Sequence, residues 1–187
     1  GRVIPAFTRN RLRSWGDARM PRPDDARDGL AVGASILVAA AELAAPALVA
    51  WLALVAAVLH GARLLGWRGL RTWRDPLLFV LHAGYAWLAL GYAIRALELL
   101  DPAWSGPWAL HGLLTGAVGT MTLAVMSRAT LGHTGRELRA GVVLTTAFAA
   151  VQAAALVRLV GGPEAWPLAG GLWAAAFLLF LLRCTPM

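Results

Sequence analysis

Apolar residues fill most of the chain in six long runs, and polar residues gather in the short stretches between them. The runs consist mainly of alanine, leucine, valine and glycine, without the polar–apolar alternation of barrel strands. Backbone polar groups in lipid must be hydrogen-bonded within the protein, which leaves helices for such runs. The pattern therefore predicts an all-α, polytopic transmembrane helix bundle of about six spans. The expected spans cover about residues 30–45, 46–65, 76–100, 108–128, 138–160 and 166–182.

The first 28 residues differ from the rest of the chain. They contain seven arginines, four aspartates and three prolines, so they predict a polar arm or loop at the membrane surface. Residues 29–187 then form the six-span bundle. A helix needs roughly 20 residues to cross the bilayer core, which makes the first and sixth runs the shortest candidates.

The composition supports membrane insertion. The chain is 59% hydrophobic and 14% charged, whereas soluble domains average roughly 45–50% and about 25%. The net charge is +7, and arginine supplies all the positive residues. These arginines lie between apolar runs and not on a soluble basic surface, which argues against nucleic-acid binding. The single cysteine, Cys184, excludes an intramolecular disulfide.

The arginines also predict an orientation. If the spans alternate, the arm, residues 66–75, residues 127–139 and the C-terminus lie on one side, and they hold most of the arginines. The opposite side has few arginines and several acidic residues. Loops rich in arginine remain in the cytoplasm. Both termini of this chain are therefore expected there.

All four histidines lie in or beside the predicted spans, where an ionisable residue suggests a functional site. His60 and His82 lie on adjacent helices, each roughly 9 Å from the arginine-rich end, so together they suit a haem iron or half of a metal site. His111 enters from the other end, roughly 13 Å in height from His82, too far to share its iron. His133 lies just outside the bilayer. Each histidine also has a structural interpretation: His60 as an interfacial residue, His82 and His111 as hydrogen-bonded packing residues, and His133 as a loop residue at a helix end.

The stretch 126–136 places His133 between Arg128 and Arg136 at the end of a span. Haem has two propionates, and arginine pairs bidentately with carboxylates. With iron at the level of His60 and His82, the propionates would reach the surface that holds Arg2, Arg128 and Arg136. The alternative is that these arginines only set orientation.

Four blocks of this sequence resemble the NnrS family: residues 1–8 (GRVIPAFT), 81–91 (LHAGYAWLALG), 111–121 (HGLLTGAVGTM) and 126–136 (MSRATLGHTGR). The resemblance implies a bacterial inner-membrane protein of about twelve spans that contains haem and copper and acts in denitrification or tolerance of nitric oxide. It also implies that this chain is the C-terminal half, with the N-terminal half as partner and nitric oxide as a possible ligand.

By match to these blocks, the candidate cofactor-binding residues are His82, His111, Arg2, Arg128 and Arg136. The candidate metal ligands are His82, His111 and His133. His60 rests on its depth alone, and copper rests on the resemblance alone. No enzymatic reaction is implied by the residues. Two other functions remain open: a membrane transporter of a metal, haem or small anion, and a structural partner of another complex.

Overall fold

The computed structural model describes residues 3–22, 24–104 and 106–185, and nearly all of them are helical. No strand occurs among the described residues, which confirms the all-α bundle. The α-helices are α1 (Val3–Ser14), α2 (Asp25–Ala44), α3 (Pro46–Gly66), α4 (Pro76–Leu100), α5 (Trp108–His111), α6 (Thr120–His133), α7 (Gly141–Val160) and α8 (Trp166–Cys184). A π-helical segment, Gly112–Gly119, joins α5 to α6 without a break.

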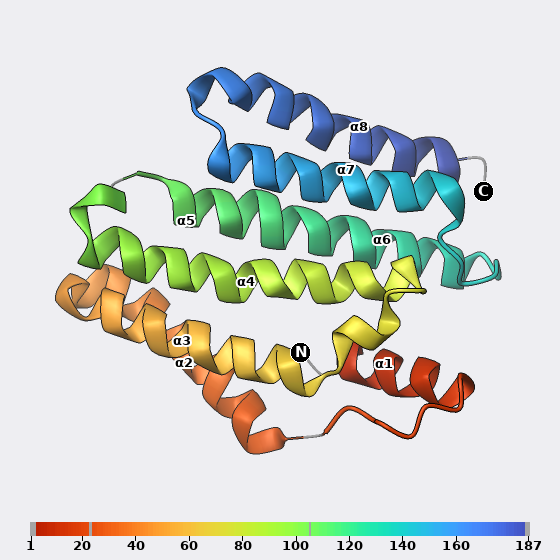
Figure 1. The fold of residues 1–187 in the computed structure, drawn as a ribbon, viewed down its shortest axis with the longest axis horizontal. Coiled ribbons are helices and arrows are strands. Elements are labelled where there is room, and N and C mark those ends of the chain that lie inside the picture. Colours follow the sequence, from red (N-terminus) through yellow and green to blue (C-terminus); the bar gives the residue numbers. More distant parts are fainter. Residues whose placement is uncertain (1–2, 23, 105, 186–187) are drawn as a thin grey trace.

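The long helices lie side by side in sequence order (Figure 1). The row runs from α8 through α7, the α5–α6 helix and α4 to α3, with α2 packed against α3. Successive helices are antiparallel because short connections join them. Proline begins α3 and α4, where its missing N–H costs no hydrogen bond. The Asp24 side chain caps α2 by accepting a hydrogen bond from the Arg27 main-chain N–H.

Five of the described helices are long and apolar enough to cross a membrane. They are Pro46–Gly66, Pro76–Leu100, Trp108–His133, Gly141–Val160 and Pro163–Cys184. The first predicted span lies in α2, which is not among them. Its 20 residues include Asp25, Arg27, Asp28 and Glu42, too many charges for an apolar span. The structure therefore gives five candidate spans, and α2 accompanies them along α3.

The two ends of the bundle match the alternation expected from the arginines. The connections at residues 67–75 and 134–140, the end of α8 and α1 lie at one end (Figure 1), which we call the arginine-rich end. Residues 101–104, after α4, and 161–165, between α7 and α8, lie at the opposite end. Within the polar arm, residues 3–14 form α1, whose buried residues Ile4, Thr8 and Leu12 recur every four positions on one face.

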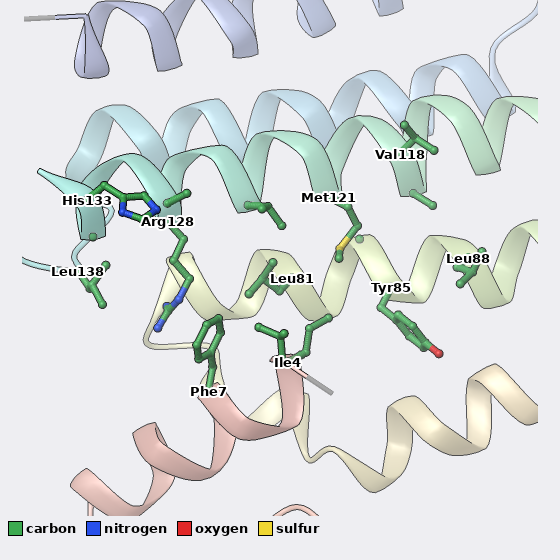
Figure 2. A pocket seen from close by; sticks show the side chains of 16 residues that line it. Ile4, Phe7, Leu81, Tyr85, Leu88, Val118, Met121, Arg128, His133 and Leu138 are labelled. Atoms are coloured by element: carbon green, nitrogen blue, oxygen red, sulfur yellow. The ribbon is translucent and has the colours of Figure 1, made fainter. Parts of the chain in front are cut away.

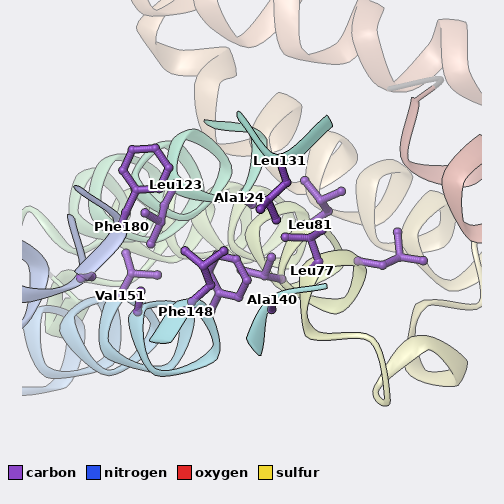
Figure 3. Close-up of a cluster of buried hydrophobic side chains, with 14 of the residues drawn as sticks. Leu77, Leu81, Leu123, Ala124, Leu131, Ala140, Phe148, Val151 and Phe180 are labelled. Carbon is purple, nitrogen blue, oxygen red and sulfur yellow. The ribbon is translucent and has the colours of Figure 1, made fainter. Parts of the chain in front are cut away.

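The main hydrophobic core lies between α4, α6, α7 and α8 (Figure 3). Leu81 of α4, Leu123 of α6, Val151 of α7 and Phe180 of α8 all belong to it. Nearby, the π-helical segment approaches α4 closely. A methyl group on Gly116 would lie 2.5 Å from the Trp87 ring. The glycines of this span therefore serve close helix packing, as small residues do in membranes.

Candidate functional site: an apolar groove with a cationic end

A groove of about 870 Å³ lies between α1, α4 and the continuous helix of Gly112–Gly119 and α6. Its volume is within the range of small-molecule sites, roughly 300–1,000 Å³. Most of its wall is hydrocarbon (Figure 2). The lining residues are Val3, Ile4, Phe7, Leu81, Gly84, Tyr85, Leu88, Ala117, Val118, Met121, Val125, Arg128, Ala129, Gly132, His133 and Leu138.

Arg128 and His133 make the arginine-rich end of the groove polar. The half-buried Arg128 side chain extends from α6 toward α1 and lies 3.8 Å from the centre of the Phe7 ring (Figure 2). Among the residues that the structure describes, none accepts a hydrogen bond from its guanidinium. His133 is exposed at the groove's rim. The groove thus presents, beside apolar walls, a cation whose hydrogen-bond donors no described residue uses.

A smaller cavity of about 420 Å³ adjoins this end and shares Phe7, Arg128 and Leu138 with the groove. Its other walls include Arg11 and Asp75. The Arg11 Nε lies 2.5 Å from the Asp75 Oδ2 in an ion pair whose angles are not those of a hydrogen bond. Arg128 therefore stands between the apolar groove and a charged cavity.

Helix α1 forms one wall of the groove because two contacts hold it on α4. The fully buried Thr8 Oγ1 donates to the Ile4 carbonyl and lies 2.8 Å from His82 Nε2. Its single proton is used on Ile4, so the His82 Nε2–H donates to Thr8. The Arg11–Asp75 ion pair adds a second attachment. The sequence predicted an arm at the surface but not that it would close a groove.

His82 does not line the groove. Its Nε2 is used by Thr8, and its Nδ1 is buried without a partner. The backbone of Gly69 covers that nitrogen, since a methyl group on Gly69 would lie 2.5 Å from it. Arg68, directly before Gly69, has a left-handed backbone with φ 60°, which a residue with a side chain seldom adopts. His82 can coordinate a metal only after one of these neighbours moves.

His60 lies in a buried polar network. Arg63 Nη1 donates to the Tyr85 hydroxyl over 2.8 Å, and that hydroxyl lies 2.6 Å from His60 Nδ1. On the other side of the ring, His60 Nε2 lies 2.8 Å from Ser35 Oγ. Asp28 completes the network by accepting from Arg63 Nε over 2.5 Å. Both nitrogens of His60 are therefore occupied.

The structure does not bring His60 and His82 into direct contact. Tyr85 contacts both His60 and Trp67, with ring centres 5.5 and 4.4 Å away, and Trp67 lies 6.1 Å from His82. Two aromatic rings thus link the two imidazoles. The predicted pairing of these histidines on one iron stays a prediction.

His111 lies at the opposite end of the bundle, 8% exposed, with its Nδ1 unpartnered and the Trp166 ring 5.4 Å away. It does not line the groove. Arg136 is half-buried in the connection after α6, outside the groove wall. Arg2 is outside the described residues. No three histidine, cysteine or acidic side chains of the described residues are grouped to hold a metal.

Sequence reasoning missed Phe7, Tyr85 and Met121 as groove residues and Arg63 as a buried cation. One signal was available for Arg63, which follows His60 by nearly one helical turn and therefore shares its face. No comparable signal marked the groove, because it forms between α1 and two helices far away in the sequence.

The fold defines a polytopic helical bundle with the apolar helices of a membrane protein, and its groove has apolar walls and a cationic end. The family model described as NnrS protein matches residues 1–187, and the chain therefore belongs to the NnrS family. No curated protein and no solved structure matches the chain.

Proposed function

We propose that this chain binds haem in the groove and acts in the response to nitric oxide or in denitrification. The observation that carries the proposal is the groove itself, an apolar space of about 870 Å³ that ends at the Arg128 guanidinium, which has no hydrogen-bond acceptor among the described residues. Haem has the matching chemistry, a flat apolar body with carboxylates at one edge. Membership of the NnrS family supports the same ligand.

The chain's residues fit haem in part. Arg128 would pair with a propionate, and the hydrocarbon walls would exclude water from the ring. His133 and the thioether of Met121 are the groove-lining groups that suit an iron or copper ion as ligands. His60, His82 and His111 lie outside the groove wall. Their ligation, and the presence of copper, stay predictions.

When bound, a haem iron supplies a binding site for nitric oxide. The chain's residues would bind and orient the haem and would keep its surroundings apolar. We further propose that the protein lies in a bacterial inner membrane with its arginine-rich end in the cytoplasm, as arginine distribution predicts. An N-terminal half of the same protein is the proposed partner.

Haem titration of the purified chain tests this proposal. Loss of a charge-assisted hydrogen bond costs about 1.5–3 kcal/mol, so Arg128→Gln is expected to weaken haem binding about 10- to 100-fold. Arg136→Gln is the matched control, because Arg136 does not line the groove. Equal effects of the two substitutions, or no haem binding by the unaltered chain, would overturn the assignment of this groove.

Optical spectra of the haem-loaded variants then test which histidine coordinates the haem iron. His133→Ala is expected to shift the haem absorption bands if the ligand lies in the groove. His82→Ala is expected to shift the absorption bands only if His82 loses its contact with Thr8 or Gly69 when haem binds. An unchanged spectrum excludes the substituted histidine as an axial ligand.

Transport of a small anion is the second candidate function, because Arg128 is shared by the groove and the charged cavity next to it. A cation between two cavities would bind an anion that passes from one cavity to the other. Accumulation of a labelled anion in vesicles containing the chain, lost in Arg128→Gln, would favour transport over haem binding.

A further inference from the structure

Tyr85 belongs to two sites at once. It is one of the residues that line the groove, and its hydroxyl lies in the buried network on the other side of α4. Figure 2 shows the ring extending from α4 with the hydroxyl directed away from α6. Chemistry in the groove is therefore connected to the network through one aromatic ring.

The hydrogen bonds around Tyr85 have a defined direction. Arg63 can only donate, so the Tyr85 oxygen accepts from Arg63 Nη1 and its own O–H is free for His60 Nδ1. Ser35 Oγ donates to the Ala31 carbonyl over 3.2 Å and accepts from His60 Nε2–H. His60 Nδ1 is thus an unprotonated acceptor 2.6 Å from the phenol oxygen, within the range for proton transfer.

We propose that Tyr85 is a one-electron donor to oxidants in the groove, with His60 as the acceptor of its phenolic proton. The oxidant class is a small apolar radical of the nitrogen dioxide type, which forms when nitric oxide meets oxygen and which dissolves in hydrocarbon. The proposal rests on the proposed function only for the source of this oxidant, and its test needs no haem.

The step balances. The O–H bond of Tyr85 breaks, its electron reduces nitrogen dioxide to nitrite, and its proton forms a new N–H bond at His60 Nδ1. The products are a neutral tyrosyl radical, an imidazolium and nitrite. Moving the proton along an existing hydrogen bond avoids the large cost of a cationic phenol in a low-dielectric interior.

Charged and aromatic side chains from three helices surround His60 and affect the stability of its imidazolium form. Arg63 of α3 opposes a second positive charge, and Asp28 of α2 pairs with Arg63 and offsets it. The Tyr92 ring of α4 stacks on His60 with centres 5.5 Å apart and an interplanar angle of 17°. The ring centre of Trp67 lies 4.4 Å from that of Tyr85, which is close enough for electron transfer from Trp67 to the tyrosyl radical.

The chain offers an unusually clean test, since it has two tyrosines. Nitrogen dioxide is generated by pulse radiolysis of nitrate in solutions of the haem-free chain, and the radical is followed by optical absorption and electron paramagnetic resonance. Ring-deuterated tyrosine separates tyrosyl from tryptophanyl signals. We expect a tyrosyl radical in the unaltered chain and in Tyr92→Phe, and its loss in Tyr85→Phe.

The role of His60 is tested separately. His60→Gln keeps a hydrogen-bonding side chain but removes the base, and we expect radical formation to slow by about 100-fold, as for loss of a positioned proton acceptor. Formation in heavy water should be slower in the unaltered chain, a test that needs no variant. A radical confined to tryptophan or Tyr92, or a Tyr85 radical insensitive to His60→Gln and heavy water, would overturn the proposal. Haem binding is not involved in either result.

Discussion

Two arginines in this bundle, Arg63 and Arg128, differ in burial and in hydrogen bonding. Arg63 is 5% exposed, and its guanidinium donates to both Asp28 and the Tyr85 hydroxyl. Arg128 is half-buried beside the groove, with the Phe7 ring as its contact and no acceptor among the described residues. The first cation belongs to a completed internal network, whereas the second keeps hydrogen-bond donors that no described residue uses. This difference is what the proposed binding role of Arg128 depends on.

Replacing each arginine by leucine tests the comparison most directly. Arg63→Leu leaves the Asp28 carboxylate and the Tyr85 oxygen without their donor inside the bundle. Breaking a buried ion pair costs about 3–5 kcal/mol, so we expect a loss of that size in the free energy of unfolding, measured with the ligand-free chain in detergent.

Arg128→Leu, measured in the same way, removes a cation–π contact with Phe7 and no hydrogen bond, so we expect a smaller loss, about 0.5–2 kcal/mol. A loss as large as that of Arg63→Leu would mean that Arg128 is also structural. The exposed Arg74→Leu serves as the control for a change of surface charge.

Thr8 provides a test of intermediate size at the boundary between the two regions. Thr8→Val keeps the shape of the side chain but leaves His82 Nε2–H buried and unpaired. A buried donor without a partner costs about 1–3 kcal/mol. We expect a corresponding loss of stability and faster proteolysis of α1, since this bond holds α1 on α4.

Thr8→Ser retains the hydroxyl and should restore most of the protection of α1. If valine and serine behave alike, the hydrogen bond to His82 does not hold α1, and the hydrophobic contacts of Ile4 and Leu12 do.

The local parts of this fold were predictable from the sequence, and the site was predictable only in pieces. Long apolar runs and the prolines at residues 46 and 76 specify helices because each acts on its own segment. Arg128 and His133 were found because both belong to one polar stretch at the end of a span. The partners of His60 were not found, since Ser35 and Tyr85 each lie 25 residues away from it and meet it only through helix packing.

The α2 helix also shows that contacts between distant parts of the chain could not be predicted from the sequence. Its apolar stretch predicted a span, but Asp28 near its start pairs with Arg63 of α3 instead of lying in a water-exposed arm. A hydropathy pattern places the end of a span at such a charge, whereas in the structure the charge pairs with a buried cation. The depth estimate for His60 and His82 has a similar limit, because equal depth does not specify which way two imidazoles face.

The smallest expected effect concerns the polar arm outside the spans. Asp17 accepts a hydrogen bond from Arg71 Nε over 2.6 Å and another from the main-chain N–H of Arg19 over 2.8 Å. The Arg71 hydrogen bond, followed by that of Arg19, lowers the pKa of Asp17 below its ordinary value of 3.8. The folded pKa is below the unfolded one, so this contact stabilises the arm above the unfolded pKa and is lost as pH falls through the folded pKa.

Titration of the Asp17 carboxyl by NMR measures this contact directly. We expect Arg71→Gln to raise the pKa of Asp17 toward its ordinary value but not fully to it, because the Arg19 main-chain bond remains. Arg68→Gln, nearby on the same connection, should leave it unchanged. An equal rise in both variants would show that the general positive charge of the arginine-rich end, and not the specific contact with Arg71, lowers the pKa.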